Sequence, residues 1–326
     1  MMRRFLTLTL GLLLASTAAW GQELTRALPA ETILAFGVQD LADHADKLDD
    51  VIAEAERLRL GEHLSALAGE AEEATGDLPE EVPASLQDLD PLEAFGQEAW
   101  LVVSHSPFNP IPAATFVSQT SRAATGQLDA FLDELAAEDG AESFSEGDGS
   151  FYLFPIDDPE VPIPGVVAGM AGDVFVFSTN PEALRGVYRK LAGASEPSLQ
   201  SSEIFGLTVG ELGEANVYSL FDFNALADTL APALDMIGQP DLASRISSDV
   251  RTIGTFASVS RFEDDGVSSA GLRIAGADSP AFAALLAGPP GVSRQPLEFV
   301  APSALGVTVS YVDLPGWWQY LNELMM

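Results

Sequence analysis

One sequence pattern occurs three times in the chain, and it limits the folds that the chain can adopt. Each occurrence is an apolar run that ends in an aspartate and a hydrophobic residue and then passes into helical periodicity. The first spans 29–41 and the third spans 302–314, with the same spacing from proline to aspartate, whereas the second, 216–223, lacks the proline. We interpret the unit as a buried strand, an aspartate such as Asp40 that caps a helix, and an amphipathic helix.

The order of the predicted elements repeats as well. The stretches 32–137 and 216–287 each have the order strand, helix, strand, strand, helix. This order predicts an α+β fold, with duplicated strand-helix-strand-strand-helix units that form mainly antiparallel sheets covered by helices. A segment rich in Gly, Ser, Ala and Pro at 193–201 favours two halves, 22–195 and 196–326, with one continuous domain as the alternative. Chance similarity of short apolar runs is the competing explanation of the repeat.

Turn and capping residues locate several further elements. Asn180 followed by Pro181 predicts a helix start, because Asn accepts hydrogen bonds from free amides and Pro suits the first helical position. The sequence Gly-Asp-Gly at 147–149 predicts a hairpin, and Asp265-Gly266 predicts another. Apolar runs predict strands at 98–104, 113–119, 165–170 and 174–178, and helical periodicity predicts helices at 122–137, 203–212, 223–234, 240–251 and 279–287.

The N-terminus predicts export. Arg3 and Arg4 precede an apolar run at 5–14, and small residues precede a cleavage site after Gly21, which is the pattern of a signal peptide at 1–21. A retained N-terminal anchor is the alternative. The chain has no cysteine, so neither a lipoprotein nor a disulfide-bonded protein is expected. No later run reaches the roughly 18 apolar residues of a spanning helix, so we expect a periplasmic or extracellular protein without a stable membrane span.

The charge of the chain excludes one class of partner. The full chain has a net charge of −34 with two lysines among its basic residues, and loss of Arg3 and Arg4 with the signal makes it −36. Such a surface repels nucleic acid and anionic lipid headgroups. It attracts cations diffusely, so weak calcium binding is kept as an alternative to a protein without cofactors.

Three short segments carry a resemblance to a known family. They are Leu-Pro-Ala at 28–30, Gly-Asp and a strand ending in serine at 172–178 before the helix at 181–184, and Ser198-Leu199 before Phe205. Together they make the chain similar to a large, uncharacterised family of exported bacterial proteins, classed as a domain of unknown function, with repeated strand-Asp-Leu-helix units. The resemblance covers most of 28–326. It implies an exported α+β protein, and it supplies no catalytic residues.

Histidines and acidic turns are the first candidates for a metal site. Asp40 and His44 share a helix face, but two ligands at this spacing do not make a site, and a solvated surface is the simpler interpretation. His63 is the second of the three histidines. We find no partner for the third, His105, which we expect in a proline-rich loop. The acidic turns, Asp148 and Asp264-Asp265, lack the alternate spacing of a calcium loop, so turn geometry explains them.

Catalytic patterns give no assignment. The chain contains no Gly-x-Ser-x-Gly elbow, no Gly-x-Gly-x-x-Gly sequence and no phosphate loop. Paired carboxylates carry no information in a chain with 49 acidic residues. The densest aromatic cluster is Trp317, Trp318 and Tyr320. Core packing or a dimer seam is the favoured interpretation of this cluster. Because adjacent tryptophans on a helix point in different directions, the alternative is that one of them is exposed as a contact for a partner, a sugar or a membrane surface.

These observations favour a non-enzymatic binding or cell-envelope-associated module, whose partner is an unknown envelope protein, an unknown ligand or a second copy of the chain in a homo-dimer. Two alternatives stay open. One is an extracytoplasmic hydrolase whose catalytic carboxylates the sequence does not distinguish from the many others. The other is a calcium-responsive envelope protein, which requires acids from several loops to converge.

Overall fold

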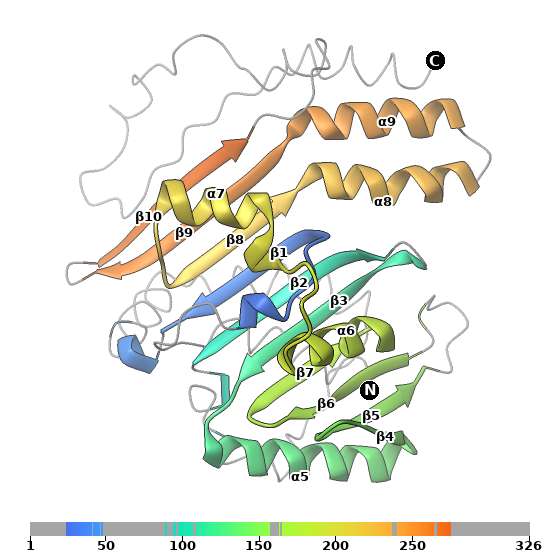
Figure 1. The fold of residues 1–326 in the computed structure, drawn as a ribbon, viewed down its shortest axis with the longest axis vertical. Coiled ribbons are helices and arrows are strands. Elements are labelled where there is room, and N and C mark those ends of the chain that lie inside the picture. Colours follow the sequence, from blue (N-terminus) through green and yellow to red (C-terminus); the bar gives the residue numbers. More distant parts are fainter. Residues whose placement is uncertain are drawn as a thin grey trace, which may run out of the picture.

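The strands of the computed structural model form a ten-stranded sheet in which every neighbouring pair is antiparallel (Figure 1). The structure describes residues 24–40, 42–45, 47, 89, 94–95, 97–106, 109–156, 163, 165–236, 240–263 and 266–274. In these residues the strand order is β10-β9-β8-β1-β2-β3-β7-β6-β5-β4. The strands are β1 (Thr32–Gln39), β2 (Glu98–Ser106), β3 (Asn109–Gln119), β4 (Glu142–Glu146), β5 (Gly149–Pro155), β6 (Gly165–Ala171), β7 (Val174–Ser178), β8 (Val217–Asp222), β9 (Thr255–Glu263) and β10 (Gly266–Ile274).

Helices lie along the sheet and at its ends (Figure 1). The α-helices are α5 (Arg122–Asp139), α6 (Pro181–Leu191), α7 (Glu203–Leu212), α8 (Phe223–Met236) and α9 (Pro240–Ile253), and the 3-10 helices are η1 (Leu24–Arg26), η2 (Ala42–His44) and η4 (Leu199–Ser201). Helix α5 begins at the Ser121 cap, whose hydroxyl accepts a hydrogen bond from Ala124, and it ends at Gly140 with φ 65°. No helix among these described residues is both long and apolar enough to cross a bilayer.

The structure confirms a mixed α+β fold with antiparallel pairing. Both predicted hairpins form, and β1, β2, β3, β6, β7 and β8 lie where apolar runs predict strands. Strands from both proposed halves, 22–195 and 196–326, join the same sheet. The helix predicted at 279–287 and the third copy of the repeat lie outside the described residues.

The duplication is not confirmed and stays a prediction. The first two copies provide neighbouring strands, and from the β1–β8 pair outward the next strands follow chain order on each side, β8-β9-β10 and β1-β2-β3. When the copies are aligned on their aspartates, Gly37 of β1 corresponds to Ser219 of β8. Gly37 pairs with Tyr218, whereas Ser219 pairs with Phe36. Because opposite residues of an antiparallel pair share a face, the aligned residues lie on different faces of the sheet.

Alternate residues of the central strands enter two separate cores, one on each face of the sheet. On one face, Trp100, Val102 and Tyr218 pack with residues of η1, α6 and α7. On the other face, Ala99, Phe116 and Phe175 pack with residues of α5 and with Phe95. The near-continuous apolar content of β6 and β7 follows from this arrangement, because both faces of these strands are buried.

A buried carboxylate ties η1 to the first of these cores. Glu98 is 1% exposed, and its carboxylate accepts hydrogen bonds from the indole of Trp100 (2.8 Å), the side-chain amide of Gln39 (3.3 Å) and the backbone amide of Leu24 (3.1 Å). The indole ring lies against Gly37, where an added Cβ would be 2.3 Å from ring atoms. The described chain is therefore anchored in the core from its first residue.

Of the two copies of the repeat that the structure describes, one forms the predicted aspartate cap. Asp222 caps α8, since its Oδ1 accepts hydrogen bonds from the amides of Asn224 (2.8 Å) and Ala225 (3.4 Å). The prediction for Asp40 is wrong in the described residues, where its Oδ1 has no hydrogen-bond partner. Asp40 has φ 61°, and this left-handed backbone lies outside the extended region that an N-cap residue needs.

Candidate functional site

A cleft of about 250 Å³ opens beside helix α6. One wall is the first half of the helix and its last turn, and the other walls are the connection from η1 to β1, the end of β2 and the start of β3. Most of its apolar lining consists of small side chains, and its polar lining includes both signs of charge. The lining residues are Ala27, Pro29, Glu31, Ser104, His105, Ala113, Asn180, Glu182, Ala183, Gly186, Val187, Arg189 and Lys190.

Helix α6 has the cap that its sequence predicts, and one of its faces is buried. The side-chain oxygen of Asn180 accepts hydrogen bonds from the amides of Glu182 (2.9 Å) and Ala183 (3.4 Å). The helix buries Leu184, Val187 and Tyr188 in the core on its face of the sheet. Because residues three and four apart share a helix face, burial of this stripe fixes which other positions line the cleft.

The opposite wall is fixed by backbone contacts. The carbonyl of the buried Leu28 accepts a hydrogen bond from the amide of Leu199 (3.1 Å). The hydroxyl of Thr32 donates to the carbonyl of Pro29 (2.7 Å). These contacts hold the chain on both sides of Glu31, whose own side chain is exposed.

Lys190 places an ammonium group in this cleft. Its Nζ donates a hydrogen bond to the carbonyl of Leu28 (3.2 Å) and makes no ion pair within the described part of the chain. Burial lowers the pKa of Lys190, the carboxylates of Glu196 and Glu31 act in the opposite direction, and Arg189 adds to the lowering. An ammonium has three donors, so the hydrogen bond to Leu28 leaves two N–H groups for a ligand.

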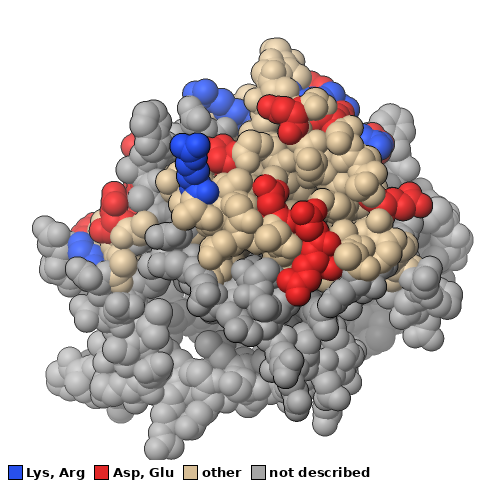
Figure 2. All heavy atoms as spheres, turned by 90° about the horizontal axis from the view of Figure 1, so that it is seen from below, with Lys and Arg blue, Asp and Glu red and all other residues tan. Residues whose placement is uncertain are grey.

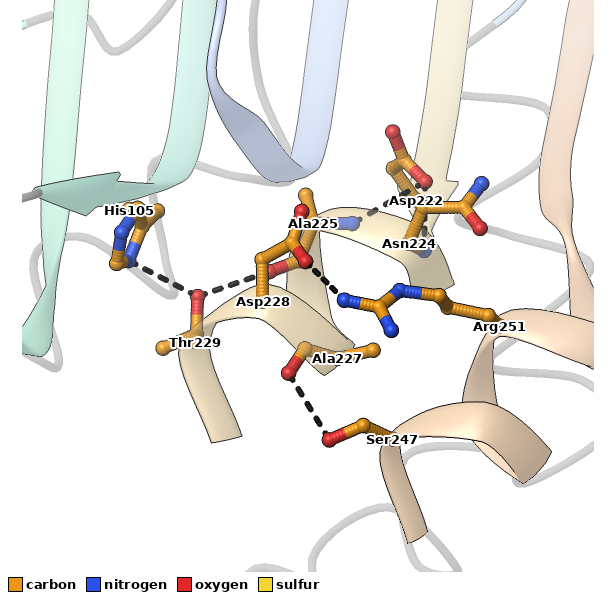
Figure 3. A network of polar contacts seen from close by, with 9 residues as sticks. All are labelled: His105, Asp222, Asn224, Ala225, Ala227, Asp228, Thr229, Ser247 and Arg251. Atoms are coloured by element: carbon orange, nitrogen blue, oxygen red, sulfur yellow. Dashed lines mark hydrogen bonds and ion pairs between the residues drawn. The ribbon is translucent and has the colours of Figure 1, made fainter. Parts of the chain in front are cut away.

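His105 connects the cleft to helix α8, which corrects the prediction that it lies in a loop without a partner. It lies in β2, its amide donates to the carbonyl of Glu31 (3.0 Å), and its Nδ1 is 3.1 Å from the hydroxyl of Thr229 (Figure 3). The Thr229 hydroxyl donates its one proton to the carbonyl of Ala225 (2.9 Å). Nδ1 is therefore the donor to Thr229, which leaves Nε2 of the neutral ring as an acceptor.

Helix α8 is also held in place by contacts with helix α9. Arg251 of α9 pairs with Asp228, and the hydroxyl of Ser247 donates to the carbonyl of Ala227 at 3.5 Å (Figure 3). These contacts hold α8 against α9 and so fix the partner of His105. His105 is thus held by both its ring and its backbone.

Two basic side chains, Arg189 and Lys190, line the cleft of a strongly acidic protein. The net charge is −34, and Figure 2 shows acidic side chains spread across the described part of the face seen from below, with a few basic ones. Arg189 of the cleft is already engaged, since its Nε is 3.4 Å from a carboxylate oxygen of Glu196. Lys190 has no such carboxylate partner in the described residues.

The predicted candidate residues are not brought together. Trp317, Trp318 and Tyr320, the proposed partner contact, lie outside the described residues, as do His63 and the Asp264-Asp265 turn. The ring of His44 is 5.6 Å from the ring of Phe262, away from the cleft lining. Asp148 accepts a hydrogen bond from the hydroxyl of Tyr188 (2.7 Å), so it braces the hairpin against α6. Among the described residues, no three His, Asp or Glu side chains are placed to hold a metal ion.

Sequence reasoning missed Glu31 and Lys190 as site residues. Lys190 is one of two lysines in the chain and lies in the last turn of a well-capped helix, which was a usable signal. Glu31 had no signal of its own among so many acidic residues.

Comparisons with protein-family models, with curated proteins and with solved structures gave no match. The chemistry of the cleft therefore has to be argued from its own residues.

Proposed function

We propose that this protein is an exported, non-enzymatic binding module of the cell envelope, and that the cleft beside α6 is its ligand site. The observation that carries the proposal is the Lys190 ammonium, which is held in the cleft with two donors to spare. Small apolar walls with a few fixed polar groups are typical of small-molecule sites. Export is the part of the proposal that rests on the predicted signal at 1–21.

Two carboxyl groups with raised pKa values lie away from the cleft. The pKa of Asp129 is raised by burial and then by the nearby Asp133, and the pKa of Asp40 is raised chiefly by burial. Neither residue lines the cleft. Acids of raised pKa inside a pocket are a sign of acid-base catalysis, so the hydrolase alternative gains no support from the described residues.

A variant that fills the cleft tests the proposal. Gly186 lines the cleft, and a Cβ added there meets only a guanidinium nitrogen of Arg189 at 4.0 Å. Gly186→Phe should therefore fold, because replacing glycine within a helix also favours the helix. Gly206→Phe is the matched control, since Gly206 lies inside the ten-residue helix α7 with open space around its Cβ position.

The measurement is the melting temperature of the exported protein and of both variants with a panel of small amines, carboxylates and zwitterions. A ligand that binds the folded state raises the melting temperature by mass action. We expect at least one member to do so in the parent and in Gly206→Phe but not in Gly186→Phe. An equal rise in both variants would place the ligand site elsewhere.

A further inference from the structure

We propose that the cleft selects small zwitterions with their two charges at opposite ends, and that Lys190 binds the carboxylate and Glu31 binds the ammonium. This inference rests on the proposed function and specifies the class of ligand. It follows from which charged groups of the cleft are already paired, from the net charge of the protein and from the size of the cleft.

The basic group available to a ligand is Lys190. Arg189, the other cation that lines the cleft, lies 3.4 Å from Glu196, so its charge is already compensated. The ammonium of Lys190 is positioned by the carbonyl of Leu28, a neutral acceptor that leaves its positive charge without a counter-ion in hydrogen-bond contact. A ligand carboxylate would accept from the two unused N–H groups, and hydrogen bonds between charged groups are stronger than those between neutral ones.

The acidic group available to a ligand is Glu31. Glu182, the other acid that lines the cleft, forms an ion pair with Arg185. Glu31 has an exposed side chain and no ion pair within the described residues, and its backbone carbonyl accepts a hydrogen bond from His105. Its charge acts on Lys190 without a direct bond between them. The cleft therefore has two separated charges of opposite sign, and each has unused hydrogen-bonding capacity.

The net charge argues for a ligand that carries both signs. A simple anion would have to approach a protein of net charge −34 and would be repelled at low ionic strength. A simple cation would be attracted, but to acidic groups over the whole surface rather than to the cleft in particular. A zwitterion has no net charge, so it avoids the long-range repulsion and still makes both short-range contacts.

The cleft also limits the size of the ligand. Its volume of about 250 Å³ corresponds to about eight water molecules at the density of liquid water. This is below the usual range for drug-sized ligands, and it suits an amino acid with a terminal amine or a short dipeptide. Ala27, Ala113 and Ala183 give the cleft short apolar walls, against which a run of methylene groups can pack.

The test is a calorimetric titration of the exported protein with three probes that each have five carbons. δ-Aminopentanoate carries both charges, pentanoate carries the carboxylate alone, and pentylamine carries the ammonium alone. We expect δ-aminopentanoate to bind about tenfold more tightly than either of the others, because each charged hydrogen bond contributes roughly this factor. If pentanoate or pentylamine binds as tightly as δ-aminopentanoate, the proposal that the ligand is a zwitterion is wrong, although the cleft would still be a ligand site.

Two variants assign the ends of the ligand. Lys190→Met should make δ-aminopentanoate bind no better than pentylamine, and Glu31→Gln should make it bind no better than pentanoate. Lys47→Met is the control, because Lys47 is the other lysine of the chain and its Nζ donates to the carbonyl of Glu263, away from the cleft. Unchanged affinities in the first two variants would overturn the proposal even if the zwitterion binds. If none of the three probes binds, the zwitterion proposal is wrong as well. The proposed function is wrong only if, in addition, no member of the broader panel raises the melting temperature of the parent in a way that Gly186→Phe abolishes.

Discussion

Strands β1 and β8 are neighbours in the interior of the sheet. An aspartate lies at the end of each strand, but the carboxylates of these two aspartates differ in their hydrogen bonds. Oδ1 of Asp222 accepts hydrogen bonds from two amides of α8 and from the hydroxyl of Thr255 (3.2 Å). Oδ1 of Asp40 is buried with no partner in the described residues, and the backbone of Asp40 is left-handed. An aspartate after a strand is therefore a cap only when its backbone stays extended, so that the carboxylate faces the free amides of the helix.

The strands also differ in what their side chains meet. Gly37 of β1 faces the indole of Trp100, whereas Ser219, its counterpart when the two copies are aligned, lies in a shallow groove with Phe221 and Phe256. The two positions that align in the proposed repeat thus differ, since β1 requires glycine there and β8 accepts a hydroxyl. The difference follows from the face of the sheet on which each residue lies.

The largest change in the free energy of unfolding should come from replacing Gly37 of β1 with serine, the residue at the aligned position 219 of β8. Gly37→Ser places a Cβ 2.3 Å from the ring of Trp100, and this ring cannot move easily because its nitrogen donates to the buried Glu98. We expect Gly37→Ser to lower the free energy of unfolding by about 3 kcal/mol, the upper end of the usual cost of overpacking. Urea unfolding followed by tryptophan fluorescence measures it.

The reciprocal change is the control. Ser219→Gly removes a side chain from a partly exposed position, so it should lower the free energy of unfolding by no more than about 1 kcal/mol, the usual cost of a glycine within regular structure. If the two substitutions destabilise the protein equally, Gly37 is not held by Trp100 and the contrast between the strands is wrong.

The second-largest change in stability should come from removing the Asp222 cap of helix α8. Asp222→Ala removes the acceptor of two amide hydrogen bonds and should lower the free energy of unfolding by about 1–2 kcal/mol. The amide protons of Asn224 and Ala225 should then exchange faster with solvent, and NMR-detected hydrogen exchange measures this directly. Asp40→Asn should show no comparable loss, since no cap is removed and Asn tolerates the positive φ of Asp40. Similar losses in both variants would mean that the two aspartates have the same role.

Local chemistry made part of the fold predictable. The Asn180 cap, the Gly-Asp-Gly hairpin and the second hairpin, β9 with β10, each depend on a few adjacent residues, and all of them form. The cap predicted at Asp40 also depends on local residues, but it depends in addition on the sign of φ at Asp40. An aspartate does not determine this sign, because aspartate tolerates both positive and negative φ. The sheet order was beyond local reasoning, since it depends on which strands share apolar faces.

The cleft could not have been predicted from the sequence. Glu31 and Lys190 are brought together because Leu28 and Leu199 are hydrogen-bonded and because Leu184 and Val187 are buried against the sheet. These are contacts between distant parts of the chain. The sequence predicts a helix at α6, and its apolar residues indicate which face is buried. The role of the charged residues next to that face becomes visible only when the opposite wall of the cleft is known.

The smallest effect, and the most specific one, is the pH dependence of Asp40. Burial raises the pKa of this carboxyl, Asp43 and Glu214 raise it further, and His44 lowers it. The folded state therefore holds the proton more tightly than the unfolded state. It follows that the ionised carboxylate opposes folding, and that stability falls as the pH rises from the unfolded value, about 3.9, through the folded pKa. Asp40→Asn removes this cost and keeps a residue that tolerates positive φ.

We expect Asp40→Asn to raise the free energy of unfolding at neutral pH by roughly a few tenths of a kcal/mol, a small value because solvent screens a partly exposed charge. The gain should shrink as the pH falls through the folded pKa and should be nearly lost below about 3.9, where the parent carboxyl is protonated in both states. Asp43→Asn is the matched control, since it keeps Asp40 and removes one charge that raises its pKa. Urea unfolding at several pH values measures all three proteins. If Asp40→Asn instead destabilises the protein at neutral pH, the carboxylate of Asp40 has a stabilising partner in solution, and the contrast with Asp222 would be one of degree only.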